Sequence, residues 1–174
     1  YSMSLGVDHM KYVVQQNQNV AITGSIEDSG IAYDGDYNNE TINIEDGFLR
    51  FEHSDGLNYI NFEYRRFDNL VKYENWNLNI AEGLGTGFLL PRTNATLFNN
   101  KRHDKFHLAG YGFSAVVALN LSYKRFFIQS ELKGGFINMP DMRTTEYKSD
   151  RASQHFFFSQ LNFLVGYSFS LNKD

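Results

Sequence analysis

A serine and a histidine near the end of the chain are the first residues whose types and spacing could do chemistry. Ser153 and His155 are two positions apart, so in an extended strand their side chains lie on one face. A hydroxyl beside an imidazole is the minimum for nucleophilic acyl transfer, provided that a third group orients the base. Asp150 is acidic and close in sequence, but its spacing does not mark it as that group. The sequence therefore favours the absence of catalysis, with Ser153 and His155 as the candidate pair.

A second group of residues carries metal-ligand chemistry. His103, Asp104 and His107 offer the imidazole and carboxylate groups that zinc accepts. If His107 already belongs to a strand, the two imidazoles need not converge, and a loop surface is the ordinary interpretation. The chain has no cysteine, which excludes a thiolate site. We predict no metal site and no cofactor.

Acidic residues concentrate between positions 27 and 55. Ca²⁺ takes several carboxylate and carbonyl oxygens, but the spacing of an EF-hand is absent here. Carboxylates at irregular intervals are typical of a solvated loop, which is our prediction for this stretch. The residues are Glu27, Asp28, Asp34, Asp36, Glu40, Glu45, Asp46, Glu52 and Asp55.

Charged and amide side chains also recur within otherwise apolar segments. On the inward faces of neighbouring strands such side chains converge, and they form either a binding site or a structural ion-pair network. A barrel of about eight strands has an interior just wide enough for side chains, which favours the network and argues against an open pore. The predicted lumen network is Asp8, Glu63, Arg65, Gln129, Glu131 and Lys133.

The elements that must position these residues are strands. Over residues 155–171 apolar side chains occupy most of one row of alternate positions, and this period of two indicates a strand rather than a helix. The alternate row becomes small and polar. The same division recurs in the segments 1–13, 58–67, 75–90, 106–123 and 126–136.

Length and composition indicate a membrane. Several segments exceed the roughly 9–11 tilted residues that cross a bilayer, whereas soluble strands average about 5–6. Aromatic residues make up 16% of the chain and gather near segment ends, as interfacial girdles require. No run approaches the roughly 18 apolar residues of a spanning helix, and the mean hydropathy of -0.43 averages an apolar row with a polar one. The net charge of -4, with scattered basic residues, argues against a nucleic-acid partner.

These patterns predict an all-β fold, a transmembrane antiparallel up-and-down β-barrel forming a single domain over residues 1–174. The connection at 123–125 is very short, so we place it and the loop 68–74 in the periplasm, and the loops 91–105 and 139–153 outside. Residues 15–56 then form an extracellular insertion with a hairpin of strands 20–26 and 42–52.

Two further details concern turns and strand number. Asp55-Gly56 predicts a tight turn between strands. The spanning segments number six, whereas closed barrels use about eight or more strands, and Tyr1 begins within a strand pattern. We therefore expect additional strands in the complete protein. Glu82 interrupts a lipid-facing row, and the glycines that follow it predict a bulge or slip that turns it away, with a functional carboxylate as the alternative.

Several segments resemble a family of uncharacterised outer-membrane β-barrels of Bacteroidetes-type bacteria. They are DHMKYV at 8–13, GLGTGFLLPRTNATLF at 83–98, RHDKFHLAGYGFSA at 102–115, FFIQSELKGGFINMPDMRTT at 126–145 and ASQHFFF at 152–158. The resemblance implies location and fold, and it brings no catalytic residues to carry over. The Ser-x-His pair also resembles outer-membrane lipid A deacylases, but those have the order His-x-Ser, so no catalytic role is carried over.

The sequence thus predicts an integral outer-membrane barrel with a structural or accessory role in a cell-envelope complex. Its expected partners are outer-membrane lipid, lipopolysaccharide and other outer-membrane proteins. Three alternatives remain open. These are an outer-leaflet lipid-modifying enzyme, a surface barrel that binds a ligand or ion through its insertion, and a soluble lipocalin-like carrier with its apolar row turned inward.

Overall fold

The computed structural model describes residues 1–27, 29–30, 32–45, 47–98, 100 and 105–170. In these residues the chain is all-β, every strand pairing is antiparallel, and no helix is long and apolar enough to cross a membrane. The predicted antiparallel all-β class is confirmed. The strands are β1 (Ser2–Met10), β2 (Gln18–Ile26), β3 (Gly35–Ile44), β4 (Leu49–Tyr73), β5 (Trp76–Leu97), β6 (Gly110–Tyr123), β7 (Phe126–Arg143) and β8 (Arg151–Tyr167).

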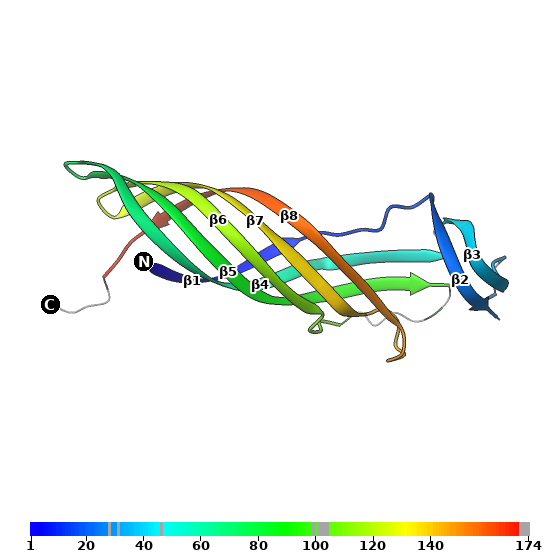
Figure 1. Ribbon diagram of the computed structural model, residues 1–174. Helices are drawn as coiled ribbons and strands as arrows, with labels where there is room; N and C mark the ends of the chain where they lie inside the picture. The colour runs from blue at the N-terminus through cyan, green and yellow to red at the C-terminus, as the bar shows by residue number, and fades with distance from the viewer. Residues whose placement is uncertain (28, 31, 46, 99, 101–104, 171–174) are drawn as a thin grey trace.

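Six strands form one curled sheet in the order β1-β4-β5-β6-β7-β8 (Figure 1). From β4 onward each strand pairs with the next one along the chain, which is up-and-down connectivity. The remaining strands, β2 and β3, form a separate two-stranded sheet beyond one end of the curled sheet. In the described residues β1 and β8 do not pair with each other, so the sheet is open between them.

Three strands continue into stretches that the alternation predicts as loops. The bounds predicted for the loops 68–74, 91–105 and 139–153 are wrong, because β4 extends to Tyr73, β5 to Leu97 and β7 to Arg143. Backbone hydrogen bonds extend a ladder whatever the side-chain polarity, so a loss of alternation does not mark the end of a strand.

Tight turns close the end of the curled sheet away from β2 and β3. Glu74 and Lys124 adopt positive φ angles of 50° and 52° in the turns that follow β4 and β6. The Lys124 amide donates to the carbonyl of Asn75 at 3.0 Å, which joins the two turns. The very short connection predicted at 123–125 is confirmed.

Asp55-Gly56 does not form the predicted turn between strands. Both residues lie within β4, at an irregularity where the pairing with β5 shifts between His53 and Leu57. Gly56 has a φ of +83°, and a Cβ there would lie 1.9 Å from the ring of His9. The position therefore requires glycine, and the irregularity lets β4 continue instead of reversing.

The hairpin predicted within residues 15–56 is confirmed, but its second strand is β3 rather than 42–52. The chain reverses just after Ile44, where the amides of Phe48 and Leu49 both donate to the carbonyl of Glu45. Residues 49–53 consequently belong to β4 and pair with β5.

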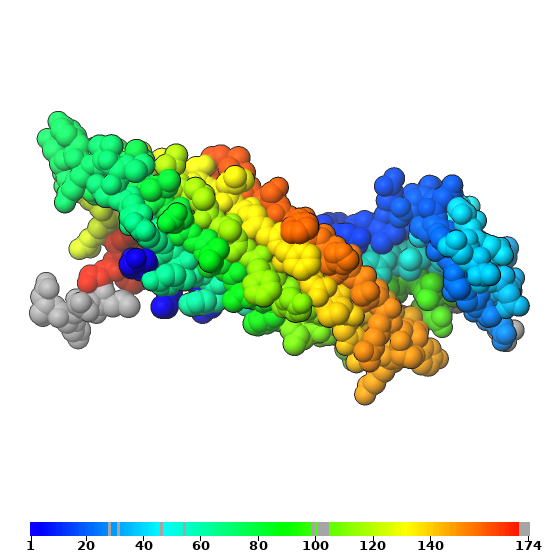
Figure 2. Space-filling view, viewed as in Figure 1, coloured from blue at the N-terminus to red at the C-terminus, as the bar shows by residue number. Residues whose placement is uncertain are grey.

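The two faces of the curled sheet differ in polarity. Large apolar side chains project outward and remain exposed, with Leu5 and Phe157 both at 83%. The inward face carries buried charged side chains, among them Glu63 and Lys133 at 3% each. Figure 2 shows β5 to β8 as a continuous outer wall. A sheet that folds in water buries its apolar face, so this arrangement is reversed.

Candidate functional site

The inward face brings all the residues of the predicted lumen network into contact. Arg65 on β4 bonds the carboxylate of Glu63 and lies 2.6 Å from that of Glu131 on β7. The Nζ atom of Lys133 lies 2.7 Å from Glu63 and 2.5 Å from Asp8 on β1. The amide of the network's glutamine donates to Glu131 at 3.0 Å. We call this set the charged cluster, and it consists of Asp8, Glu63, Arg65, Gln129, Glu131 and Lys133.

Three asparagines that the sequence reasoning missed extend the charged cluster. Asn61 donates to the carboxylate of Asp8 at 2.9 Å, and Asn162 donates to that of Glu131 at 3.2 Å. Asn120 donates to the side-chain carbonyl of the cluster's glutamine at 3.1 Å. Each asparagine has the inward parity of its strand, so strict counting in steps of two would have found all three.

Glycines on β5 make room for these charges. A Cβ at Gly83 would lie 2.8 Å from the Cγ of Arg65, and a Cβ at Gly85 would lie 2.8 Å from the Cγ of Glu63. The pairing of β4 with β5 is regular here, since both of its irregularities lie elsewhere. The bulge predicted from these glycines is therefore wrong. Their physical role is to admit larger side chains from the neighbouring strand.

The chemistry of the charged cluster is that of an ion-pair network. It holds three carboxylates and two cations, and the carboxylates contact either a cation or an amide donor. Buried charges are costly unless they are paired and hydrogen-bonded, so each member depends on the others. The described carboxylates and cations of the cluster thus pair with one another across β1, β4 and β7.

An apolar cluster fills the inward face on the side of the charged cluster that is nearer to β2 and β3. We use this name for Phe51, Leu57, Tyr59, Leu89, Ala95, Ala109, Ile137, Met139 and Met142, all of them buried. The ring of Tyr12 stacks on that of Phe156 with 6.3 Å between centroids, so the segment after β1 contacts β8 at this level. The curled sheet is thus closed by side chains at one end even though its edge strands do not pair.

A histidine lies within the apolar cluster. His53 is completely buried, its Nδ1 lies 3.4 Å from the hydroxyl of Thr93, and the rings of Tyr12 and Phe51 flank it. Burial, together with the nearby His107, lowers the pKa of His53 from 6.5 to about 4. The side chain is therefore neutral at pH 7. The sequence reasoning missed His53, because a single histidine in a polar stretch carries no signal of burial.

The predicted catalytic pair lies outside this interior. Ser153 and His155 are exposed on the outward face of β8, and no hydrogen bond joins these two described residues. The imidazole of His155 instead approaches the ring of Phe136, with centroids 6.2 Å apart. Asp150 accepts a hydrogen bond from the hydroxyl of Thr145 at 2.6 Å. In the part of the chain that the structure describes, Asp150 therefore does not orient the imidazole of His155.

Of the predicted metal ligands, His103 and Asp104 lie outside the described residues. The Nδ1 of His107 lies 3.1 Å from the carbonyl of Lys105, and its Nε2 accepts the amide of Arg143 at 3.0 Å. Within the described ranges, no three histidine, aspartate or glutamate side chains converge in a way that could hold a metal ion.

Several acidic residues of the insertion stabilise local structure. Ser25 donates to Asp36 at 2.6 Å across the β2–β3 pair, and Asn94 donates to Glu52 at 2.8 Å across β4 and β5. Asp36 and Glu40 belong to β3, and Glu52 and Asp55 belong to β4, so the prediction of a loop is wrong for these four residues. Two of the acidic residues, Asp28 and Asp46, lie outside the described residues.

The outward face carries an aromatic row next to the tight turns. Trp76, Tyr123, Phe126 and Tyr167 stand in register across β5 to β8. The rings of Trp76 and Tyr123 have centroids 4.6 Å apart, and those of Phe126 and Tyr167 are 4.9 Å apart. This row marks one end of the exposed apolar surface.

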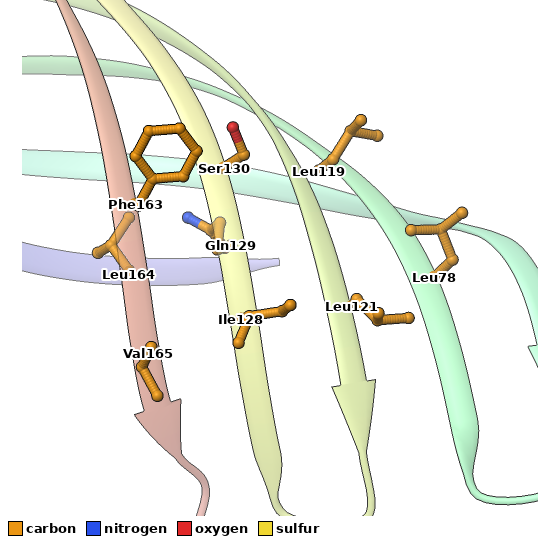
Figure 3. Close-up of a pocket in the computed structure, with 9 residues that line it drawn as sticks. All are labelled: Leu78, Leu119, Leu121, Ile128, Gln129, Ser130, Phe163, Leu164 and Val165. Atoms are coloured by element: carbon orange, nitrogen blue, oxygen red, sulfur yellow. The ribbon is translucent and has the colours of Figure 1, made fainter.

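At the other end of that surface stands a second row in register, Phe88, Tyr111, Asn138 and His155. Between the two rows the outward side chains are mostly apolar. Figure 3 shows some of them, including Leu119, Ile128 and Phe163, around a shallow pocket on the outer wall. The apolar side chains thus form a band bounded by aromatic and polar residues.

Glu82 is the charged residue within this band on β5. It stands directly opposite Arg66 in the register of β4 and β5. Arg66 also lies 2.9 Å from Asp68, and these side chains are exposed. A cation on the neighbouring strand, rather than a bulge, therefore accompanies this carboxylate.

Comparison of the chain with protein-family models, with curated proteins and with solved structures gives no match.

Proposed function

We propose that the curled sheet is the wall of a transmembrane β-barrel of a bacterial outer membrane, with a structural or accessory role in a cell-envelope complex. The observation that carries this proposal is the reversed polarity of the sheet. Exposed apolar side chains are favourable against acyl chains, and inward charges are favourable where they pair with each other.

The height of the apolar band supports the same proposal. Tyr111 and Tyr123 bound the band on β6 and are twelve positions apart. At roughly 3.3 Å per residue this is about 40 Å of strand, and a tilt of about 45° reduces it to about 28 Å along the membrane normal. The hydrocarbon core of a bilayer is about 30 Å thick.

A barrel in lipid must close, because unpaired strand edges do not occur in hydrocarbon. The pairing order makes β1 and β8 antiparallel to each other, so an even number of added strands keeps every neighbour antiparallel. Two strands would give eight, the size at which side chains just fill the interior. Contacts from β4 to β7 across the interior, such as that of Arg65 with Glu131, agree with this curvature.

The contents of the interior favour a structural role over transport. The charged cluster occupies one part of the inward face and the apolar cluster another. An aqueous channel needs a wider barrel with an unfilled lumen. The alternatives of an enzyme, an ion-binding barrel and a lipocalin-like carrier rank lower, because no observed geometry favours any of them.

The single tryptophan of the chain offers a direct test in lipid vesicles. Trp76 lies in the aromatic row at the edge of the band, whereas Leu132 lies halfway between the two rows on β7. With lipids brominated at chosen depths, we expect Trp76 fluorescence to be quenched most by bromines near the headgroups. In the double variant Trp76→Phe/Leu132→Trp, quenching should be strongest for bromines near the bilayer centre.

Gel mobility provides the control, since a closed barrel in SDS migrates differently before and after boiling. Fluorescence that no lipid bromine quenches, from protein that fractionates as soluble, would overturn the proposal. If quenching depended on bromine depth in the same way for Trp76 and for the tryptophan introduced by Leu132→Trp, the outward face would not span a bilayer.

A further inference from the structure

Two arginines face each other on the outer wall just beyond the apolar band. Arg143, at the end of β7, and Arg151, at the start of β8, are direct partners in the strand register. Both have the outward parity of their strands, as Ser153 and His155 do. Like charges directly opposite each other on a sheet are destabilising, so this pair calls for a compensating anion.

The protein itself supplies part of that compensation, to Arg151 rather than to Arg143. Both guanidinium groups turn toward the Lys148 carbonyl, with Arg143 Nη1 at 3.4 Å and Arg151 Nε at 3.2 Å. Arg151 Nε also lies 3.5 Å from Asp141, where both side chains are about half exposed. Among the described residues, no carboxylate lies within ion-pair distance of Arg143 or Lys148. The guanidinium groups of Arg143 and Arg151 thus share one neutral oxygen, in a hairpin that also holds Lys148 and the carboxylates of Asp141, Glu146 and Asp150.

The distance of Arg143 and Arg151 from the edge of the apolar band indicates which kind of anion they would meet. Arg151 is four positions along β8 from His155, which stands in the row that bounds the apolar band. This separation is roughly 13 Å of strand, or about 9 Å along the membrane normal at a tilt of about 45°. Headgroups occupy the layer of about 5–8 Å outside the hydrocarbon, and long arginine side chains can reach back toward it.

We propose that Arg143 and Arg151 form a binding site for the phosphate of a lipid headgroup in the outer leaflet. This inference rests on the proposed membrane location. Guanidinium groups bind phosphate oxygens through pairs of charge-assisted hydrogen bonds, and two facing guanidinium groups can grip one phosphate from both sides. The acyl chains of the same lipid would then lie along the apolar band below, beside Phe157.

The test measures lipid retention by the folded protein in detergent. Gel mobility before and after boiling first establishes the folded barrel, so failure of the membrane proposal is seen independently of lipid binding. Native mass spectrometry then counts bound glycolipid carrying two phosphates and compares it with the dephosphorylated form. The variant Arg143→Gln/Arg151→Gln should bind the phosphorylated lipid at least about tenfold more weakly, since it loses both charge-assisted contacts.

A matched control removes two cations from the opposite end of the wall. Lys124→Gln/Arg125→Gln changes the turn after β6 and should bind the glycolipid as the unchanged protein does. Equal binding by all three proteins would overturn the proposal, and so would equal retention of the dephosphorylated lipid. Displacement of the lipid by an equal concentration of inorganic phosphate would show a free-anion site and refute the lipid assignment. If the double variant fails to fold, Arg143→Gln alone is tested against the same control.

Discussion

The two parts of the interior are filled in opposite ways. The charged cluster joins β1, β4 and β7 through ion pairs and lies where the sheet is open between β1 and β8. The apolar cluster lies at the level where Tyr12 stacks on Phe156 and bridges the same opening. Apolar packing is non-directional and closes an end of the sheet without strand pairing, whereas ion pairs demand definite partners. The charged part therefore specifies which strands face each other, and the apolar part seals the end.

The largest expected effect comes from breaking the charged cluster. Lys133→Met leaves Glu63 and Asp8 without their shared cation, which should lower the free energy of unfolding by about 4 kcal/mol. The measurement is urea unfolding in vesicles followed by Trp76 fluorescence. Adding Glu63→Gln and Asp8→Asn to the variant should restore much of the loss. An unchanged midpoint in the single variant would show that the cluster does not stabilise the fold.

A substitution in the apolar cluster should lower the free energy of unfolding slightly less. Ile137→Ala removes buried side-chain volume and should lower the free energy of unfolding by about 3 kcal/mol. The matched control is Ile128→Ala on the same strand, whose side chain faces outward and should cost less than about 1 kcal/mol because lipid fills the space. Equal losses in the two variants would contradict the assignment of inward and outward faces.

His53 makes the apolar cluster sensitive to acid. Its pKa is about 4 when folded and near 6.5 when exposed, so the unfolded state binds its proton first as the pH falls. The contribution of neutral His53 is fully present above pH 6.5 and should be lost between pH 6.5 and 4, by roughly 3 kcal/mol. Thermal unfolding across this range should be less pH-dependent for His53→Asn than for the unchanged protein. Parallel pH profiles would exclude His53 as the titrating group.

The smallest effect is expected outside both clusters. Ser153→Ala alters an exposed hydroxyl on the outward face and should change the free energy of unfolding by less than about 0.5 kcal/mol. Lipid A composition in cells should also stay the same, as mass spectrometry of extracted lipid would report. A change in acylation that follows this substitution would revive the enzymatic alternative.

Alternation by itself predicted the strands and the direction of most side chains. Counting in steps of two placed Glu63, Arg65, Glu131 and Lys133 on inward faces, and the short connection at 123–125 was visible as a turn. The reason is that a pleated strand fixes the face of each residue from its position alone. The same counting placed Asn61 in the row of Glu63, but the predicted network did not include it.

The ends of the strands were not predictable in this way. Residues 71–73 of β4 and 93–97 of β5 have no clean alternation. The first range nevertheless pairs with the start of β5, and the second pairs with the start of β4. Gly56 shows the same limit, because a turn and a bulge share the signal of a glycine with positive φ. A turn and a bulge differ in whether the residues after Gly56 continue to pair with β5. This pairing is seen only in the tertiary structure.

What the sequence determined was the polarity of the two faces, since each side chain carries its own solvation preference and the strand period assigns it a side. What only the tertiary structure decided was which distant residues meet. Arg65 and Glu131 are 66 positions apart, and Lys133 and Asp8 are 125 apart. Their contacts depend on strand order, register and curl, which arise from the pairing of whole strands and not from any local pattern. The burial of His53 and the juxtaposition of Arg143 with Arg151 have the same origin.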